Sequence, residues 1–254
     1  MSDQQLILGL IEESPPPLHQ VVLGPNAEAW SWLARIGQGE SPPGDRLLIW
    51  GAPGSGKTAA LRALSQQLLA GGVAHHLLHL KGGLEQDGLG SGASQPSWAE
   101  ALAALDRPLL IDNLEHASPA LQQALFARLV AQPRGALMVA SAGCSLSELA
   151  RLGVREDLRT RLAQGLVYPL APLSEPEQLL VLRQKAHALG WTAQPEDTQF
   201  DAIFLYMLKR MPRHLGWLCG LLQAVDHAAL AQKRPVSVPL LRTVAEGFNA
   251  PSAT

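Results

Sequence analysis

The order of apolar and polar residues changes in character about two thirds of the way along the chain. Before that point, short apolar runs that fit β-strands alternate with longer segments of helical periodicity. The expected strands cover residues 47–50, 74–80, 108–112 and 136–141. The expected helices begin at about Ala27 and cover residues 58–69, 98–105 and 119–131. This alternation predicts an α/β fold, in which helices cover both faces of a parallel sheet.

The last third of the chain is predicted to be helical. No run typical of a strand follows about Tyr168. Ser174 and Glu177 have the spacing of a capping box, the signature of a helix N-terminus. Helices are expected over residues 178–189, 199–210, 212–229 and 238–248. We therefore expect an N-terminal segment over 1–17, an α/β domain over 18–171 and a small helical domain over 172–254.

Two stretches lie outside this pattern. Residues 5–10 are mostly apolar, and the charged, proline-rich residues 12–17 that follow predict a stiff spacer. Residues 81–97 are rich in Gly and Ser, and we expect them to form a mobile loop.

The residues after the first expected strand carry the strongest chemical signal. They read Gly51-Ala52-Pro53-Gly54-Ser55-Gly56-Lys57-Thr58 and match the phosphate-loop pattern G-x-x-x-x-G-K-[ST] between a strand and a helix. Glycines let successive N–H groups point at one phosphate, and the helix N-terminus adds a favourable potential there. Lys57 can reach the β- and γ-phosphates, and the Thr58 hydroxyl can take a position on Mg²⁺. The sequence therefore predicts a nucleoside-phosphate site built from Gly51, Pro53, Gly54, Ser55, Gly56, Lys57 and Thr58.

A second acidic position completes such a site. Asp112 ends the buried run 109–111, and a carboxylate on a neighbouring strand is what phosphate-loop proteins use to hold Mg²⁺. The alternative is that Asp112 only ends a strand at a turn. The next residue is Asn113, which cannot act as a base, and Glu115 is a weaker candidate for orienting water. We therefore assign Thr58 and Asp112 to the metal.

Two arginines are candidates for contacts with nucleotide phosphates. Arg161 lies in the arginine-rich segment 155–162 and could reach the phosphate of a neighbouring subunit, as arginine fingers do. The alternative is a solvent-exposed helix face on which Asp157 and Arg161 form an intrahelical pair. Arg213 precedes an apolar helical run and could touch the nucleotide from the helical domain.

Composition narrows the class of protein. The chain has 254 residues, of which 47% are apolar, and its net charge of −2 gives no overall basic footprint for nucleic acid. No signal segment or apolar run long enough to cross a membrane is present, and Cys144 and Cys219 lack metal-ligand spacing. We therefore expect a soluble, cytoplasmic protein. The histidines, including His79, are expected to lie at strand ends or on the surface without an acidic partner.

Several of these motifs occur together, in this order, in one known group of proteins. They comprise the segment 23–29, the loop 51–58, Leu110-Ile111-Asp112-Asn113, the segment 157–166, Pro172-Leu173-Ser174 and Arg213-His214-Leu215. The chain resembles the AAA+ module of the bacterial replication initiator DnaA, and more narrowly the Hda family of regulatory inactivators of DnaA. The resemblance runs from about Gln5 to Phe248. The chain stops soon after the helical domain, so the DNA-binding domain of DnaA is not expected.

The N-terminal segment supports the narrower resemblance. Residues 5–10 resemble the Q-L-x-L-x-L peptide with which Hda binds the DNA polymerase sliding clamp, so Gln5, Leu6, Leu8 and Leu10 are the implied contacts. A short extended segment can insert alternate apolar side chains into a groove, with Gln as a polar anchor. Gly9 stands where the family commonly has Pro, which raises the entropy lost on binding. The alternative is an apolar strand that packs on the domain.

The resemblance also implies roles for single residues. Leu23 and Asn26 would lie at the base pocket, Arg161 would act on ATP bound to a partner, and Arg213 would contact this chain's own nucleotide. The position that senses the γ-phosphate falls near Gly143 and Cys144 and has no suitable polar residue. The implied cofactors are ADP or ATP with Mg²⁺, and weak intrinsic hydrolysis is expected.

The function implied by the resemblance is regulatory. The chain would dock on the sliding clamp, contact DNA only indirectly, and stimulate hydrolysis of ATP bound to the DnaA AAA+ domain; assembly into a homo-oligomer is left open. One alternative is a stand-alone AAA+ ATPase, such as a helicase loader or transposition helper. The other is an adaptor that binds nucleotide without triggering hydrolysis.

Overall fold

The computed structural model describes residues 18, 21–81, 84–87, 102, 107–131, 137–212 and 214–248. The chain forms two compact units, one over Pro15–Pro172 and one that contains Leu173–Thr254. The two units are described separately below.

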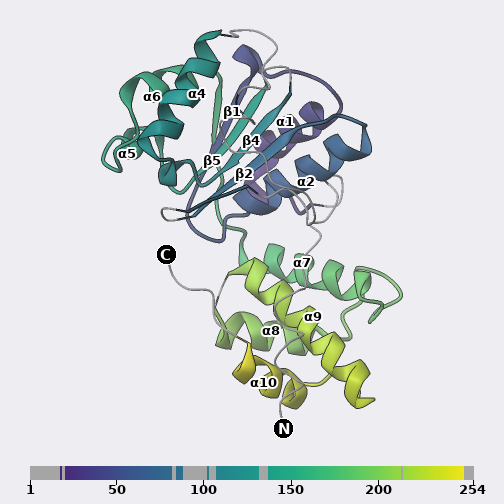
Figure 1. The fold of residues 1–254 in the computed structure, drawn as a ribbon. Coiled ribbons are helices and arrows are strands. Elements are labelled where there is room, and N and C mark those ends of the chain that lie inside the picture. Colours follow the sequence, from purple (N-terminus) through teal and green to yellow (C-terminus); the bar gives the residue numbers. More distant parts are fainter. Residues whose placement is uncertain are drawn as a thin grey trace. The chain divides into compact units, whose positions relative to one another are not determined.

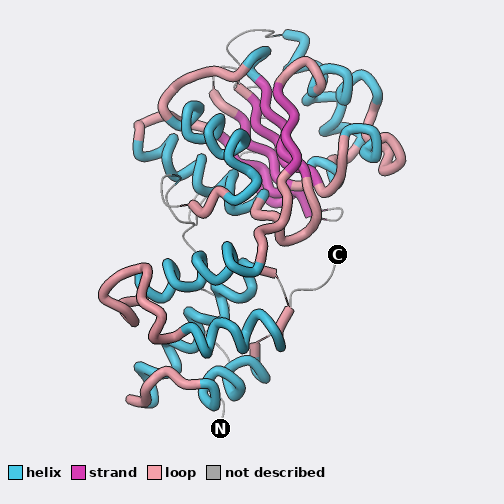
Figure 2. The backbone as a smooth tube through the Cα atoms, turned by 180° about the vertical axis from the view of Figure 1, so that it is seen from behind, coloured by secondary structure: helices cyan, strands magenta, loops and turns pink. Residues whose placement is uncertain are grey.

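The first unit is built on one sheet, drawn in magenta in Figure 2. Its strands are β1 Arg46–Trp50, β2 His76–Lys81, β3 Leu84–Asp87, β4 Leu109–Asp112, β5 Met138–Ala142 and β6 Leu166–Pro169. They lie in the order β3-β2-β4-β5-β1-β6. The pairs β2–β4, β4–β5 and β5–β1 are parallel, as expected. β6 was not among the expected strands and pairs parallel with β1, and β3 pairs antiparallel with β2. The expectation of a structureless loop over 81–97 is therefore wrong at β3.

Helices cover both faces of this sheet (Figure 1). The helices are α1 Ala27–Gly37, α2 Lys57–Ala70, α4 Pro119–Ala131, α5 Leu146–Leu149 and α6 Glu156–Leu162. One apolar core joins α1 and α2 to the sheet through residues such as Leu33 and Leu64. A second joins α4, α5 and α6 to the other face through residues such as Leu121 and Leu158. Because both faces are covered, β4 and β5 are buried along their whole length.

The helix expected over 98–105 falls mostly outside the described residues. Of its positions, only Leu102 is described, and it is buried in helical conformation. Among the described residues of the first unit, short 3₁₀ turns also lie at Gly24–Asn26, Pro43–Asp45 and Leu114–His116.

The second unit is helical, as the sequence predicts. It contains α7 Glu175–Ala188, α8 Asp201–Arg210, α9 Leu215–Gln232 and α10 Val238–Gly247. The expected capping box is formed at the start of α7, where Glu177 accepts a hydrogen bond from the backbone N–H of Ser174. The apolar sides of the helices meet around Phe204, which is fully buried.

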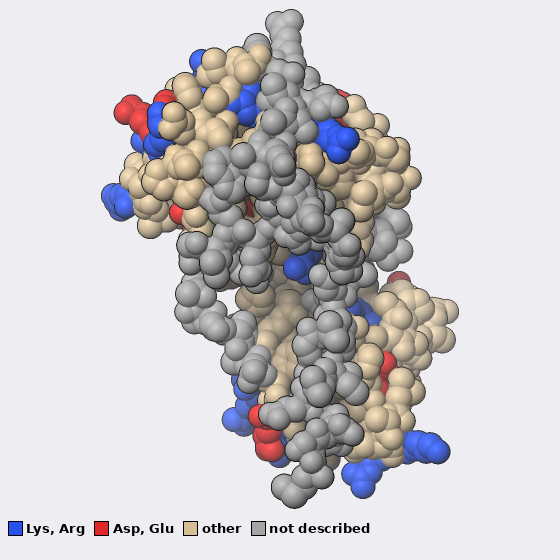
Figure 3. Space-filling model, in the orientation of Figure 1, with Lys and Arg blue, Asp and Glu red and all other residues tan. Residues whose placement is uncertain are grey.

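The surface carries charge of both signs. On the face drawn in Figure 3, the described Lys and Arg side chains are interspersed with Asp and Glu rather than gathered in one patch. No helix among the described residues is long and apolar enough to span a membrane.

Candidate functional site

The loop between β1 and α2 has the backbone geometry of a phosphate cradle. Gly54 and Gly56 adopt positive φ angles of 82° and 95°, a region that favours glycine. Gly51 is packed so closely that a Cβ there would lie 2.3 Å from the backbone oxygen of Leu170. α2 begins directly at Lys57, so its free N–H groups and dipole face the loop. The loop is thus arranged to receive an anion.

Lys57 is buried within this loop. Its Nζ donates hydrogen bonds to the backbone oxygens of Gly51 at 2.6 Å and Ala52 at 3.0 Å. Burial lowers the pKa of Lys57, while the negative charges of Glu115 and Asp112 oppose that shift. A phosphate group would give the buried ammonium the counter-charge that the two carbonyls lack.

Ser55 supplies a further polar group in the same loop. Its Oγ is buried, and no described residue hydrogen-bonds to it. A buried hydroxyl without a partner carries a desolvation cost that a phosphate oxygen would remove. This orphaned group supports the sequence expectation of a phosphate ligand.

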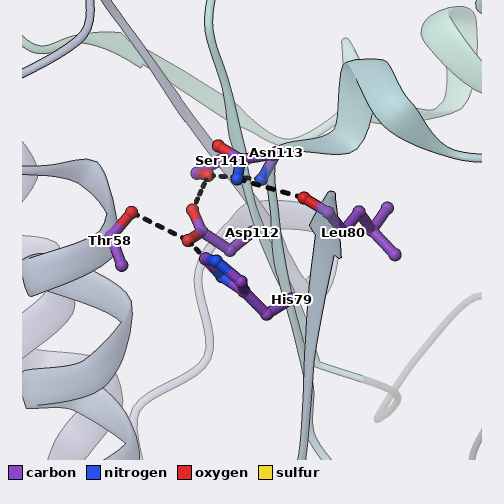
Figure 4. Close-up of polar contacts among 6 residues, drawn as sticks. All are labelled: Thr58, His79, Leu80, Asp112, Asn113 and Ser141. Atoms are coloured by element: carbon purple, nitrogen blue, oxygen red, sulfur yellow. Dashed lines mark hydrogen bonds and ion pairs between the residues drawn. The ribbon is translucent and has the colours of Figure 1, made fainter. Parts of the chain in front are cut away.

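Asp112, at the end of β4, is the centre of a polar cluster (Figure 4). Its Oδ2 accepts hydrogen bonds from Thr58 Oγ1 at 2.8 Å and from His79 Nδ1 at 2.7 Å, and its Oδ1 accepts one from Ser141 Oγ. Burial acts to raise the pKa of Asp112, but the hydrogen bonds from His79, Ser141 and Thr58 outweigh it and hold the pKa below its ordinary value. The structure thus brings together the two residues assigned to the metal, Thr58 and Asp112.

The contact between His79 and Asp112 corrects the expectation that the histidines lack an acidic partner. β2 and β4 pair in parallel, and their register places His79 directly beside Asp112. The two residues are far apart in the sequence, so only the strand pairing reveals the contact. Ser141 was also missed, because it reaches Asp112 from the neighbouring strand β5.

At the position expected to sense a γ-phosphate, near Gly143, the backbone binds a carboxylate of this chain. At the end of β5, the backbone N–H of Gly143 donates to Glu115 Oε1 at 2.9 Å. A Cβ on Gly143 would lie 2.7 Å from that oxygen, so a larger residue here would displace the carboxylate end of Glu115. The other oxygen, Glu115 Oε2, is buried, with no hydrogen-bond partner among the described residues. Glu115, the weaker candidate for orienting water, therefore lies at the end of β5, the strand between β1 and β4.

Asn113, after Asp112, has a structural role. It adopts a positive φ of 62°, its N–H donates to Ser141 Oγ, and its Nδ2 donates to the backbone oxygen of Leu80. These bonds connect β2, β4 and β5 at one edge of the sheet.

Burial and the charges of Glu115 and Glu148 raise the pKa of Cys144, which keeps this thiol protonated.

The two residues expected at the base pocket differ in environment. Leu23 is 43% exposed. Asn26 is buried, and its side-chain amide donates to the backbone oxygen of Ala171 and accepts from the backbone N–H of the same residue. Asn26 therefore fixes the start of α1 to the chain segment after β6.

Arg161 lies away from this chain's own phosphate loop. Its backbone oxygen accepts a hydrogen bond from Arg46 at the amino end of β1, whereas the loop follows the carboxyl end. Its guanidinium donates to Gln164 at 3.3 Å and lines a depression of about 750 Å³. The alternative pair between Asp157 and Arg161 is not what forms, because Asp157 bonds Arg155 instead.

Five further candidates cannot be placed. Arg213 and the expected clamp contacts Gln5, Leu6, Leu8 and Leu10 lie outside the described residues.

Both units resemble parts of known proteins. A family model described as "Hda, lid domain" matches residues 175–245, which contain α7, α8, α9 and most of α10. Domain III of the replication initiation protein DnaA from Thermotoga maritima is 18% identical with a TM-score of 0.68, covering 92% of this chain and 97% of its own.

Other similar structures share the same fold. AMPPCP-bound DnaA from Aquifex aeolicus is 15% identical with a TM-score of 0.61, covering 88% of this chain and 69% of its own. The Holliday junction branch migration motor RuvB from Thermotoga maritima is 18% identical with a TM-score of 0.54, covering 89% of this chain and 70% of its own. The chain therefore shares the fold of these AAA+ proteins, with a mainly parallel sheet flanked by helices, and its C-terminal helices match the Hda lid-domain model over residues 175–245.

Proposed function

We propose that this protein is a regulator of replication initiation that binds ADP or ATP and stimulates hydrolysis of the ATP bound to DnaA. The lid matched to Hda and the fold shared with DnaA support this class of function. One observation carries the mechanism: Arg161 lies towards the amino end of β1, away from this chain's own phosphate loop. A guanidinium in that place serves a nucleotide held by a neighbouring subunit.

The bound nucleotide has a structural role in this proposal. The loop 51–58 holds the phosphates through its N–H groups, Lys57 and Ser55, and Leu23 and Asn26 lie near the base. Thr58 and Asp112 are the residues that would hold Mg²⁺ once His79 releases Asp112 Oδ2, and the cation would then supply charge neutralisation at the phosphates. Asn113 follows Asp112 where a carboxylate could act as a base, and its Nδ2 is bonded to the backbone oxygen of Leu80, so intrinsic hydrolysis is expected to be weak.

Arg161 completes a site on the partner. Its guanidinium is partly exposed and restrained only by Gln164 among the described residues, so it is free to turn towards a docked subunit. At a DnaA subunit it would stabilise the negative charge that develops on the γ-phosphoryl group during attack by water. The product would be ADP-bound DnaA, the inactive form.

The same proposal assigns residues 5–10 to the sliding clamp. Gln5 would act as the polar anchor, and Leu6, Leu8 and Leu10 would fill the groove of the clamp. Docking on a clamp loaded on DNA concentrates the protein near DnaA, so DNA is contacted only indirectly. Arg213 would contact the nucleotide of this chain from the lid.

The first test is hydrolysis of ATP bound to DnaA in a reconstituted mixture with clamp loaded on DNA. Arg161→Ala should remove most of the stimulation, since a finger supplied in trans is worth about 10³–10⁵ in rate. Arg62→Ala, on the exposed surface of α2, is the matched control and should keep it. The proposed role of Arg161 is wrong if Arg161→Ala stimulates as well as the control.

A second arm of the same experiment separates targeting from catalysis. The double variant Gln5→Ala/Leu6→Ala should lose clamp binding in a pull-down and lose the stimulation that depends on the clamp. Unchanged clamp binding by this variant would contradict the role of the N-terminal segment. Rapid hydrolysis by the isolated protein would instead favour a stand-alone AAA+ ATPase.

A further inference from the structure

We propose that His79 occupies the metal-facing oxygen of Asp112 and so allows this protein to bind ADP without a divalent cation. The inference rests on the proposed nucleotide site. It concerns how the negative charge of Asp112 is stabilised next to the phosphates of ADP. It assigns a positioning role to a residue on β2, outside the phosphate-loop pattern.

The hydrogen bonds of Asp112 carry the first step. Its side chain is 2% exposed, and three hydrogen-bond donors surround it. Oδ2 receives both Thr58 Oγ1 and His79 Nδ1, at 2.8 and 2.7 Å, and Oδ1 receives Ser141. A carboxylate oxygen has about two acceptor directions, so Oδ2 is filled by these two donors.

The fit of Mg²⁺ to this site carries the second step. The residue types are suitable, because Mg²⁺ prefers hydroxyl, carboxylate and water oxygens. Thr58 donates its hydrogen to Asp112 and keeps its own lone pairs for a cation, but His79 covers the remaining acceptor direction of the same Asp112 oxygen. Mg²⁺ requires nearly ideal octahedral geometry and gives up its waters reluctantly. A cation could use Oδ2 only by displacing His79.

The register of the sheet shows that His79 is held in place. β2 and β4 pair in parallel, with His79 beside Asp112 and Leu78 beside Ile111. The imidazole projects from its strand towards the carboxylate in Figure 4. The contact between His79 and Asp112 is therefore set by the pairing of two strands and does not depend on the conformation of a loop.

These contacts predict how ADP binds. In an ordinary phosphate loop the cation separates the carboxylate from the phosphates, and removing it leaves two sets of negative charge facing each other. Here the donors on Asp112 already stabilise its charge, and Lys57 with the N-terminus of α2 faces the phosphates. Two phosphates are therefore accommodated without the cation.

The test measures the dissociation constant of ADP for the full chain, in Mg²⁺ and in EDTA, by equilibrium dialysis. We expect wild type to differ by less than about threefold between the two buffers. His79→Ala should bind ADP at least about tenfold more weakly in EDTA than in Mg²⁺. His79→Asn, whose Nδ2 can stand where the imidazole Nδ1 stands, should restore the behaviour of wild type.

His116→Ala is the matched control. His116 is exposed in the turn after β4, and its loss should leave both dissociation constants as in wild type. A second readout uses Mn²⁺ as the probe, measured by electron paramagnetic resonance in the presence of ADP. His79→Ala should bind Mn²⁺ several-fold more tightly than wild type, because Oδ2 is then open to the metal.

The outcomes separate this inference from the proposed function. The inference would be overturned if the dissociation constant of ADP for wild type depended strongly on Mg²⁺. It would also be overturned if the ratio of the dissociation constants in EDTA and in Mg²⁺ were the same for wild type and His79→Ala. Either result would leave the nucleotide site standing. No binding of ADP in either buffer would overturn both. Neither result depends on whether DnaA hydrolysis is stimulated, which the Arg161 experiment decides.

Discussion

At the residue scale, a missing side chain determines how Glu115 is held. The backbone N–H of Gly143 binds Glu115 Oε1, and a Cβ at Gly143 would lie 2.7 Å from that oxygen. The neighbouring atom belongs to a carboxylate that is itself fixed by this bond, so it can move away only by giving the bond up. The lack of a side chain at Gly143 therefore lets Glu115 approach the backbone and form this bond.

Gly143→Ala tests this. We expect a loss of about 0.5–1.5 kcal/mol in the free energy of unfolding, because the displaced carboxylate gives up its hydrogen bond to the backbone, measured by urea denaturation. Gly247→Ala is the matched control, because nothing lies within 4 Å of the added Cβ at the end of α10. Equal effects of the two substitutions would show that the contact with Glu115 is unimportant.

The carboxyl of Asp112 predicts a dependence of stability on pH. Its pKa lies below the ordinary value, so the folded chain binds a proton here less readily than the unfolded chain, whose aspartates titrate at about 3.9. The stability supplied by the charged form is present above that pH and is lost as the pH falls through the folded value. Asp112→Asn lacks this contribution at every pH.

We therefore expect the difference in unfolding free energy between wild type and Asp112→Asn to narrow as the pH falls from 6 towards 3. Urea denaturation at intervals of pH measures it. A difference that stays constant over this range would mean that the hydrogen bonds to Asp112 do not favour its charged form.

At the element scale, one ion pair joins two helices of the lid. Arg183 on α7 donates through Nε to Asp201 Oδ1 at 2.8 Å, and its Nη2 reaches Oδ2. Asp201 is the first residue of α8, where a negative charge also suits the helix N-terminus. The bond to Asp201 raises the pKa of Arg183 above its ordinary value. The pair is partly shielded from solvent, with side chains 18% and 21% exposed.

Asp201→Asn should lower the free energy of unfolding by about 1 kcal/mol, because a two-point contact and a favourable helix-terminal charge are lost together. Glu196→Gln, on the exposed stretch between α7 and α8, is the charge-matched control and should change stability by less than about 0.5 kcal/mol. Raising the salt concentration should shrink the difference between wild type and Asp201→Asn. A difference that does not respond to salt would contradict an electrostatic origin.

The elements that could be predicted from the sequence are those with a strong local signal. The strands β1, β4 and β5 are mostly apolar, α2 follows the phosphate loop, and α7 begins at a capping box. β3 could not be predicted, because its residues Leu84–Asp87 lie in a Gly-rich stretch with a single apolar position. It forms by pairing antiparallel with β2, which is a tertiary contact.

At the scale of the whole molecule, the chain has separate apolar cores in its two units. Phe204 is fully buried among lid helices, and Leu121 is fully buried between α4 and the sheet. A substitution in one core should therefore act mainly on its own unit, since each core excludes water by itself.

Phe204→Ala should raise amide hydrogen exchange in the helices α7 to α10 and leave the strands β1, β4 and β5 protected. The expected loss is about 3–5 kcal/mol of stability for the lid. Leu121→Ala is the reciprocal variant, with faster exchange in the sheet and an unchanged lid. Equal increases throughout the chain for both variants would show that the two units unfold as one.

The sequence by itself determined the parts of this protein that depend on local order along the chain. The phosphate loop needs consecutive residues from Gly51 to Thr58 between a strand and a helix, and the lid helices need only their own periodicity and caps. Tertiary structure decided what surrounds Asp112 and where Arg161 lies. His79 and Ser141 reach the carboxylate because β2 and β5 flank β4, and Arg161 lies towards the amino end of β1 because α6 packs there. Such contacts come from strand order and register, which no local pattern encodes.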